Sequence, residues 1–145
     1  MVLNNLLKQY TSLRSEREEV EKRIEKLDKA LQKIIEEGTV KDSVKGGVGG
    51  IQHFVIEGFP TSDYNTTRKA LIKQKKRLTK LDKDIVEKLD IIHSLVNSID
   101  NSEIRRIITY RYIYGYTWDK TAKTMGPMHN DEEIRKTAIR FLEKS

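Results

Sequence analysis

Apolar residues recur at intervals of three and four along most of the chain, which is the period of one face of an α-helix. In residues 1–37 the spacing is unbroken except for Arg17, and charged residues fill the positions between the apolar ones. The apolar members are Leu3, Leu6, Tyr10, Leu13, Val20, Ile24, Leu27, Leu31 and Ile34. A heptad seam of this kind is typical of a helix that packs along a partner helix. The pattern predicts a long first helix that ends at Gly38.

A second seam of the same type follows between residues 64 and 99, after Ser62 or Asp63 as a candidate N-cap. Its apolar members are Leu71, Leu78, Leu81, Ile85, Leu89, Ile92, Val96 and Ile99. The two seams match in length. We therefore expect the two helices to pack antiparallel as a long helical hairpin or coiled coil, with a second copy of the chain able to cover the other side of the seams.

The segment 38–63 between the two seams has a different composition. It contains the glycine-rich run GGVGG and, at 52–59, the sequence QHFVIEGF, which has the strongest strand pattern in the chain. Residues 40–44 can pair with that strand, so the segment predicts a small glycine-rich β-hairpin insertion. The glycine run is not a phosphate-binding loop, because no Lys-Ser/Thr pair follows it.

The last third of the chain predicts three shorter helices, at 103–113, 118–125 and 131–142. Asn101 or Ser102 can cap the first helix, Gly115 can end it, and Thr117 can cap the second. Ala122 and Gly126 allow a close helix crossing followed by a tight turn. These features predict a helix-turn-helix domain at 100–145, after a helical hairpin at 1–99. The expected fold is all-α with a small β-hairpin.

The segment YRYIYGYTWDKTAKTMG resembles region 4 of bacterial sigma factors. It is closer to phage-encoded sigma-like transcriptional regulators of the ArpU/RinA type. The matching residues are Arg111, Tyr112, Gly115, Thr117, Trp118, Ala122 and Gly126, while Tyr110 stands where the family has leucine. The Asp42–Gly46 segment is also similar to this family. The resemblance implies promoter binding, with the recognition helix within 130–140.

Within such a domain, polar residues of the second and third helices are the candidates for contact with double-stranded DNA. Thr117 and Lys120 begin the second helix, where free N–H groups favour a phosphate. Arginine, lysine and threonine on the third helix suit base edges or phosphates. The candidate DNA-binding residues are Thr117, Lys120, His129, Asn130, Arg135, Lys136, Thr137 and Arg140. Arg111 is expected to pair with Asp119, and Trp118 to fill the core.

The formal net charge is +6 and the sequence pI is about 9.4, values that fit an anionic partner. Residues 1–37 are electrically balanced, whereas residues 68–83 hold eight cations and a single acid, Asp82. We consider two interpretations of these cations: a solvated helix face, or a secondary contact with the DNA backbone. The candidates for the backbone contact are Lys73, Lys76, Arg77 and Lys80.

The sequence lacks the residue patterns that several classes of function require. Cysteine is absent, which excludes disulfides and thiolate metal sites. His53, His93 and His129 lie far apart, and no nucleophile has an activating neighbour, so we expect neither a metal, a cofactor nor enzyme activity. No apolar stretch is long enough to span a membrane and no secretion signal precedes the first helix, so we expect a cytoplasmic protein.

The expected function is transcriptional regulation in a phage or prophage. The C-terminal domain would bind promoter DNA, and the long helices would form a homodimer or contact RNA polymerase. Two alternatives remain open. One is a DNA-packaging subunit similar to small terminases, which also join a helix-turn-helix to oligomerising helices. The other is a coiled-coil protein-interaction module that does not bind DNA, with Asp131, Glu132 and Glu133 directed at a protein partner.

Overall fold

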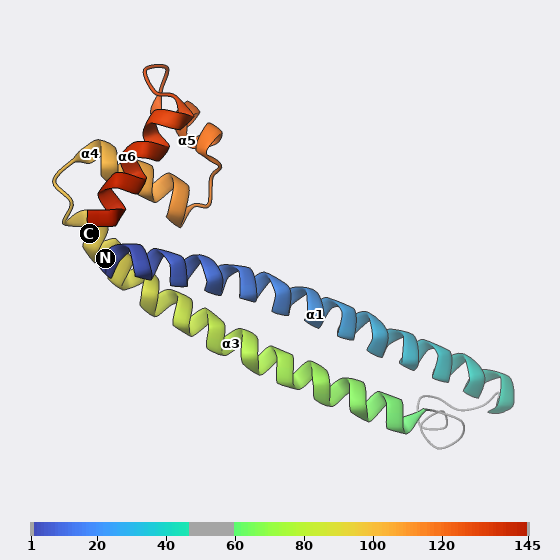
Figure 1. Ribbon diagram of the computed structural model, residues 1–145. Helices are drawn as coiled ribbons and strands as arrows, with labels where there is room; N and C mark the ends of the chain where they lie inside the picture. The colour runs from blue at the N-terminus through green and yellow to red at the C-terminus, as the bar shows by residue number, and fades with distance from the viewer. Residues whose placement is uncertain (1, 47–59, 145) are drawn as a thin grey trace. The chain divides into compact units, whose positions relative to one another are not determined.

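A computed structural model describes residues 2–46 and 60–144, and the described residues form helices joined by short loops (Figure 1). Five are α-helices and one is a short π-helix. In order they are α1 (Val2–Gly46), α3 (Thr61–Asn97), α4 (Ser102–Ile108), the π-helix η1 (Thr109–Ile113), α5 (Trp118–Met125) and α6 (Asp131–Lys144). Over the described ranges there is no β-strand. The all-α expectation is therefore confirmed.

The first helix is longer than its sequence pattern predicts. It continues through Gly38 to Gly46, so the expected end at Gly38 is wrong, and residues 40–44 are helical rather than a strand. A single glycine inside a helix costs only about 1 kcal/mol relative to alanine, which a long helix tolerates. The second expected strand, at 52–59, lies outside the described residues.

The chain divides into two compact units. Unit 1 consists of Met1–Glu16 and Asp82–Ser145, and unit 2 consists of Arg17–Leu81. The two ends of the chain thus belong to the same unit, together with the last four turns of α3. The sequence suggested a division at residue 100, which assigns residues 1–16 and 82–99 to the helical hairpin. In the structure these residues belong to the same unit as the C-terminal helices.

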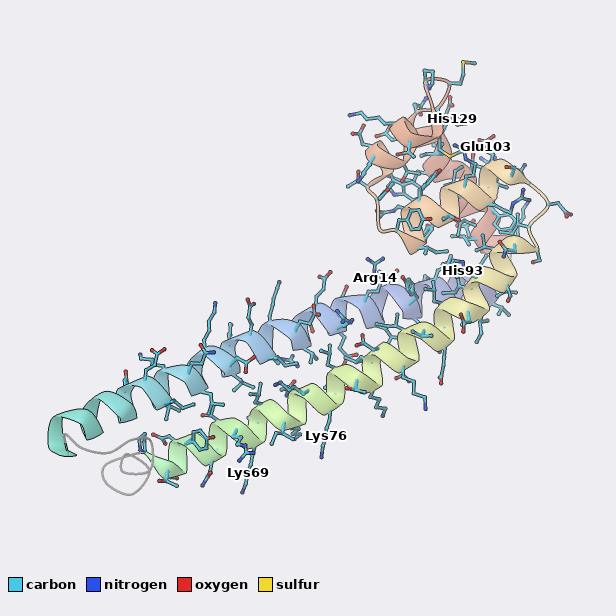
Figure 2. All side chains as sticks on the ribbon, turned by 180° about the vertical axis from the view of Figure 1, so that it is seen from behind. Arg14, Lys69, Lys76, His93, Glu103 and His129 are labelled. Carbon is cyan, nitrogen blue, oxygen red and sulfur yellow. The ribbon has the colours of Figure 1, made fainter. Side chains whose placement is uncertain are left out.

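In unit 2, the later part of α1 and the first part of α3 run antiparallel, side by side (Figures 1 and 2). Three seam residues, Val20, Leu71 and Leu81, are buried between them. Other seam residues, such as Leu27 and Leu78, are only half-buried. Two helices alone cannot enclose a seam on all sides, and this explains the partial burial.

Unit 1 holds two apolar clusters. The larger joins three parts of the chain that are distant in sequence: the start of α1, the end of α3 and the C-terminal helices. Its buried members are Leu3, Leu7, Tyr10, Ile92, Val96, Ile108, Ile113 and Leu142. The smaller lies among α4, α5 and α6, and its buried members are Ile107, Ala122, Met125, Ile134 and Ala138.

The helix formed by α4 and η1 separates these clusters and contributes to both. Ile107 belongs to the smaller cluster, whereas Ile108 and Ile113 belong to the larger one. The sequence predicted one regular helix over 103–113, but its second half is a π-helix in which the Tyr114 N–H donates to the Thr109 carbonyl at 2.9 Å. The wider π turn underwinds the helix, so that Ile113 reaches the cluster that already contains Ile108.

Replacing Leu7 with alanine tests whether α1 is a structural part of unit 1. The Leu7 side chain is 1% exposed in the larger cluster. Its truncation should lower the free energy of unfolding by about 2–5 kcal/mol, measured by urea denaturation. Val2 is the matched control on the same helix, because it is 66% exposed. Val2→Ala should change stability by less than about 0.5 kcal/mol; equal effects of the two variants would contradict this packing.

Candidate nucleic-acid interface

Helix α5 is fixed at its start by a side-chain cap and along its inner side by small or flexible residues. The Thr117 hydroxyl accepts a hydrogen bond from the Lys120 N–H at 3.1 Å, as the sequence predicted. The Thr121 hydroxyl donates to the Thr117 carbonyl at 2.8 Å and is fully buried. Ala122 and Met125 pack into the smaller cluster. These contacts define the direction in which α5 leaves the preceding loop.

The turn between α5 and α6 depends on Gly126. Its φ of 121° and ψ of 173° lie in a region that is essentially limited to glycine. The turn is closed by a hydrogen bond from the His129 N–H to the Gly126 carbonyl at 3.1 Å. Asn130 then caps α6, because its side-chain oxygen accepts from the Glu133 N–H at 2.9 Å. The Thr117 cap that the sequence suggested for α5 is thus confirmed, and the DNA-binding candidate Asn130 serves as the cap of α6.

Helix α6 presents one apolar and one charged face. Ile134, Ala138 and Leu142 are buried, and the opposite side is exposed. At about 100° per residue, Arg135 and Arg140 lie on either side of a ridge formed by Glu132 and Lys136. Both arginines are exposed, and neither forms a hydrogen bond or ion pair with another residue of the described chain. They are the two guanidinium groups of α6 that are available to a ligand.

The other polar candidates on α6 have intramolecular partners. Lys136 forms an ion pair with Glu132 at 3.2 Å, one turn earlier. The Thr137 hydroxyl donates to the Glu133 carbonyl at 2.9 Å. The acidic residues in the first turn face the positive end of the helix dipole, which they stabilise. An incoming phosphate would therefore meet Lys136 only after its pair with Glu132 opens.

The candidates before α6 are engaged within the fold to different degrees. The Lys120 ammonium group lies 4.0 Å from the centre of the Tyr116 ring but stays exposed. The His129 Nε2 lies 3.7 Å from a carboxylate oxygen of Glu103, and Figure 2 shows the two residues side by side. The His129 Nδ1 is buried without a partner. Lys120 is thus placed for contact with a ligand, whereas His129 is turned towards α4.

A cluster of three tyrosines, which the sequence did not predict as a group, lies beside the start of α5. The rings of Tyr110 and Tyr116 stack at 5.8 Å with an interplanar angle of 3°, and Tyr114 contacts both. The alternating spacing of these residues gave the only sequence signal. They meet because η1 is followed by a turn at Gly115, whose φ is +76°. Tyr114 is 53% exposed, which confirms that it faces solvent in part.

Arg111 has a different role from the one expected. It donates to the Tyr116 carbonyl at 2.8 Å, and its guanidinium lies 4.8 Å from the centre of the Trp118 ring. Asp119, the expected partner, pairs instead with Lys123 at 3.0 Å. Arg111 therefore links η1 to the start of α5 through the Tyr116 carbonyl and the Trp118 ring.

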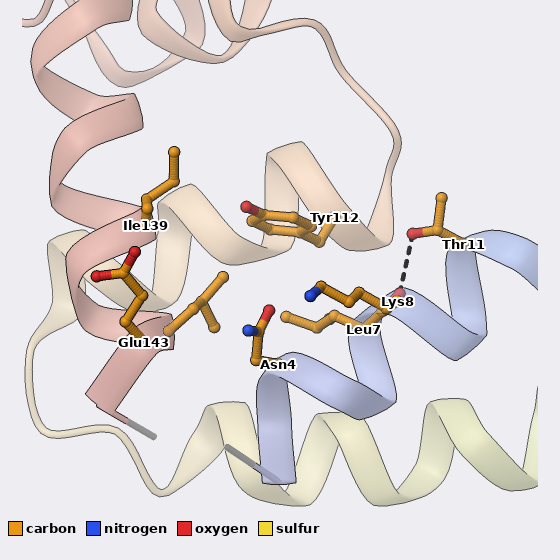
Figure 3. A pocket seen from close by; sticks show the side chains of 8 residues that line it. Asn4, Leu7, Lys8, Thr11, Tyr112, Ile139 and Glu143 are labelled. Carbon is orange, nitrogen blue, oxygen red and sulfur yellow. Dashed lines mark hydrogen bonds between the residues drawn. The ribbon is translucent and has the colours of Figure 1, made fainter.

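The last turns of α6 face the start of α1 across a groove of about 510 Å³ (Figure 3). Ile139, Leu142 and Glu143 line one side, and residues of the first three turns of α1 line the other, with Tyr112 above them. Burial raises the pKa of the Tyr112 hydroxyl above its ordinary value of 10.0, and the nearby Arg111 opposes this rise. The end of α6 is therefore directed at α1, and its beginning is the part open to a ligand.

The secondary candidates lie on α3 within unit 2, whereas the C-terminal helices belong to unit 1. Lys73, Lys76 and Lys80 share one side of α3 with Lys69, while Arg77 is turned away from that line. Unit 2 has fifteen basic and ten acidic residues, a surplus of five, whereas unit 1 has thirteen and twelve, a surplus of one. Unit 2 thus carries five of the six net positive charges of the chain.

No protein-family model, curated protein or solved structure matches the chain. Among the described helices, none is long and apolar enough to cross a membrane. Within residues 2–46 and 60–144, no group of three or more His, Cys, Asp or Glu residues could hold a metal ion. The geometry of the two units is therefore the basis for the functional assignment.

The two glycines with positive φ among the described residues, Gly115 and Gly126, should differ in their tolerance of asparagine. Gly115 adopts a left-handed conformation that asparagine accepts, whereas Gly126 lies in a region that asparagine does not. Gly126→Asn should lower the free energy of unfolding by about 1–3 kcal/mol, and Gly115→Asn by less. No atom lies within 4 Å of a Cβ at Gly126, so backbone strain alone causes the loss. Equal losses in thermal denaturation would argue against this turn geometry.

Proposed function

We propose that the chain is a sequence-specific DNA-binding protein that regulates transcription, in which α5 and α6 act as a helix-turn-helix. The observation that carries the proposal is that α6 is packed on one side and exposes unpaired arginines on the other. Its inner side is held by Ile134 and Ala138. Arg135, near its beginning, and Arg140, in its third turn, are exposed and unpaired. In a recognition helix, the N-terminal residues are the ones that contact base edges.

The surroundings of α5 support the same assignment. In helix-turn-helix proteins the helix before the recognition helix crosses the DNA backbone. Here the N-terminus of α5 carries the positive end of a helix dipole, and the exposed Lys120 lies in its first turn. The neighbouring Tyr114 and Tyr116 add hydroxyl groups that can donate to phosphate oxygens. Backbone contacts at α5 would set the orientation in which α6 enters the groove.

The acidic first turn of α6 limits what the helix can bind. Asp131, Glu132 and Glu133 repel phosphates, so non-specific affinity through α6 should be low. A carboxylate can accept a hydrogen bond from the amino group of cytosine. This arrangement favours selection of particular base pairs over tight binding to any duplex.

The long helices supply a role in assembly. Their seam is only half-buried in unit 2, and a second copy or RNA polymerase would cover it. The resemblance of residues 110–126 to sigma region 4 supports polymerase contact, and the half-buried seam supports a homodimer. With these features the chain would act at a promoter as a transcriptional regulator of phage type.

Selection from a pool of random DNA duplexes, followed by mobility-shift titration of the enriched sequence, tests the proposal. Arg135→Ala and Arg140→Ala should each weaken binding to the selected duplex by about 1–3 kcal/mol and relax the preference at one base position. Arg23→Ala is the control, because it removes the same charge from unit 2. Glu132→Gln should raise affinity, since it releases Lys136 from its ion pair.

Other outcomes of that experiment point to other functions. Failure to enrich any sequence, with intact folding, would reject the proposal and favour a protein-interaction module. Enrichment together with a ring of many copies in light scattering would favour a DNA-packaging subunit of the small terminase type, whereas a dimer would favour the regulator.

A further inference from the structure

A line of lysines runs along α3 within unit 2. It consists of Lys69, Lys73, Lys76 and Lys80, and we call it the lysine stripe. At about 100° per residue these four positions fall within an arc of about 60°, and they span about 17 Å of the helix. Figure 2 shows Lys69 and Lys76 on the side of α3 away from α1. The buried Leu71 and the half-buried Leu78 of the seam lie roughly opposite the stripe, so it faces outward from unit 2.

No described residue of unit 2 forms an ion pair with the lysine stripe. All four side chains are exposed, and none forms an ion pair with a described residue. Neighbours at i,i+3 and i,i+4 along the stripe are therefore like-charged, an arrangement that destabilises an isolated helix. By contrast, α1 in the same unit alternates acids and bases, as in the Arg17–Glu21 pair at 2.6 Å. No residue of α3 compensates the repulsion between these lysines. An anionic partner would do so.

The spacing of the stripe fits the regular charges of a nucleic-acid duplex. We propose that the lysine stripe binds the phosphate backbone of double-stranded DNA as a second, sequence-independent contact. A rigid helix places its four ammonium groups in a line, and one strand of a duplex presents a phosphate about every 3.4 Å along its axis. The stripe thus faces about five nucleotides, enough for one phosphate per lysine.

A lipid surface fits the stripe less well. Helices that bind in the membrane interface need a broad apolar face beside their basic one. Next to the lysine stripe, Ile72 is the one exposed large apolar side chain of α3 in unit 2, at 43%. The apolar seam of α3 is directed at α1. The charge is therefore presented without an apolar face that could enter a bilayer.

The stripe lies in unit 2 and the C-terminal helices lie in unit 1, so the two contacts can be tested separately. The full-length chain is titrated with a duplex of scrambled sequence at several salt concentrations. Replacement of all four stripe lysines by glutamine should reduce the slope of log K against log salt by about 3 to 4, since each phosphate contact contributes about 0.9. Arg135→Ala with Arg140→Ala should leave most of this slope in place.

A matched control removes the same charge from the other helix of unit 2. Its substitutions are Lys22→Gln, Arg23→Gln, Lys26→Gln and Lys29→Gln, at positions interspersed with acids. This variant should keep most of the wild-type slope. Substitution of the stripe lysines by arginine should keep both charge and binding. If the fourfold glutamine variant fails to fold by circular dichroism, Lys73→Gln with Lys76→Gln should give about half of the change in slope.

Four results would overturn the proposal. The first is an unchanged salt slope in folded stripe variants. The second is an equal loss in the stripe variant and the α1 control, which would mean that net charge alone matters. The third is loss of binding to vesicles containing phosphatidylserine while duplex binding is unchanged, which would assign the stripe to a membrane surface. Loss of scrambled-duplex binding by the Arg135 and Arg140 variant, with the stripe intact, would also exclude the stripe as an independent contact.

Discussion

The carbonyl group of Ile113, at the end of η1, is held by two side chains of α1. The Arg14 guanidinium donates to it at 2.6 Å, and the Tyr10 hydroxyl donates at 3.4 Å. Helix ends leave carbonyls without intrahelical partners, and a cation there also stabilises the negative end of the dipole. Because these donors come from residues about one hundred positions earlier, the start of α1 is fixed to the C-terminal helices. The larger apolar cluster of unit 1 forms around this contact.

This constraint gives α6 two different ends. Its last turns contribute Leu142 to the cluster that α1 completes, and Ile139 and Glu143 to the groove in front of α1. Its first turns pack against α4 and α5, through Ile134 and Ala138. The charged residues near Arg135 are therefore the part of α6 left open. This packing fixes the C-terminal end of α6 and leaves its N-terminal end exposed to a ligand.

Much of the fold could be predicted because its determinants are local. The caps at Asn101 and Thr117 and the positive φ of Gly115 and Gly126 depend on neighbouring residues, and all four are found. The failures involve contacts distant in sequence. The π turn of η1 exists to bring Ile113 to a cluster that includes α1, and no local pattern reports this.

The candidate site shows the same division. Its helices and their exposed residues could be predicted from the helical spacing of apolar residues and from the capping residues. The partners of individual side chains do not, since Arg111 binds the Tyr116 carbonyl rather than Asp119, and His129 turns to Glu103. The continuation of α1 past Gly38 was missed because glycine favours a helix end without requiring one. The alignment of Lys69 with Lys73, Lys76 and Lys80 was present in the sequence, and the helix geometry made it visible.

The central claim is that the beginning of α6 is open to DNA while its end is committed to α1. Chemical-shift mapping of the full-length chain, titrated with a duplex enriched by selection, tests this most directly. We expect large changes at the amides of residues 117–120, 131–137 and 140, with those of residues 3–10 and 141–143 nearly unmoved. Changes concentrated at 141–143 and the start of α1, with residues 131–137 silent, would contradict this claim.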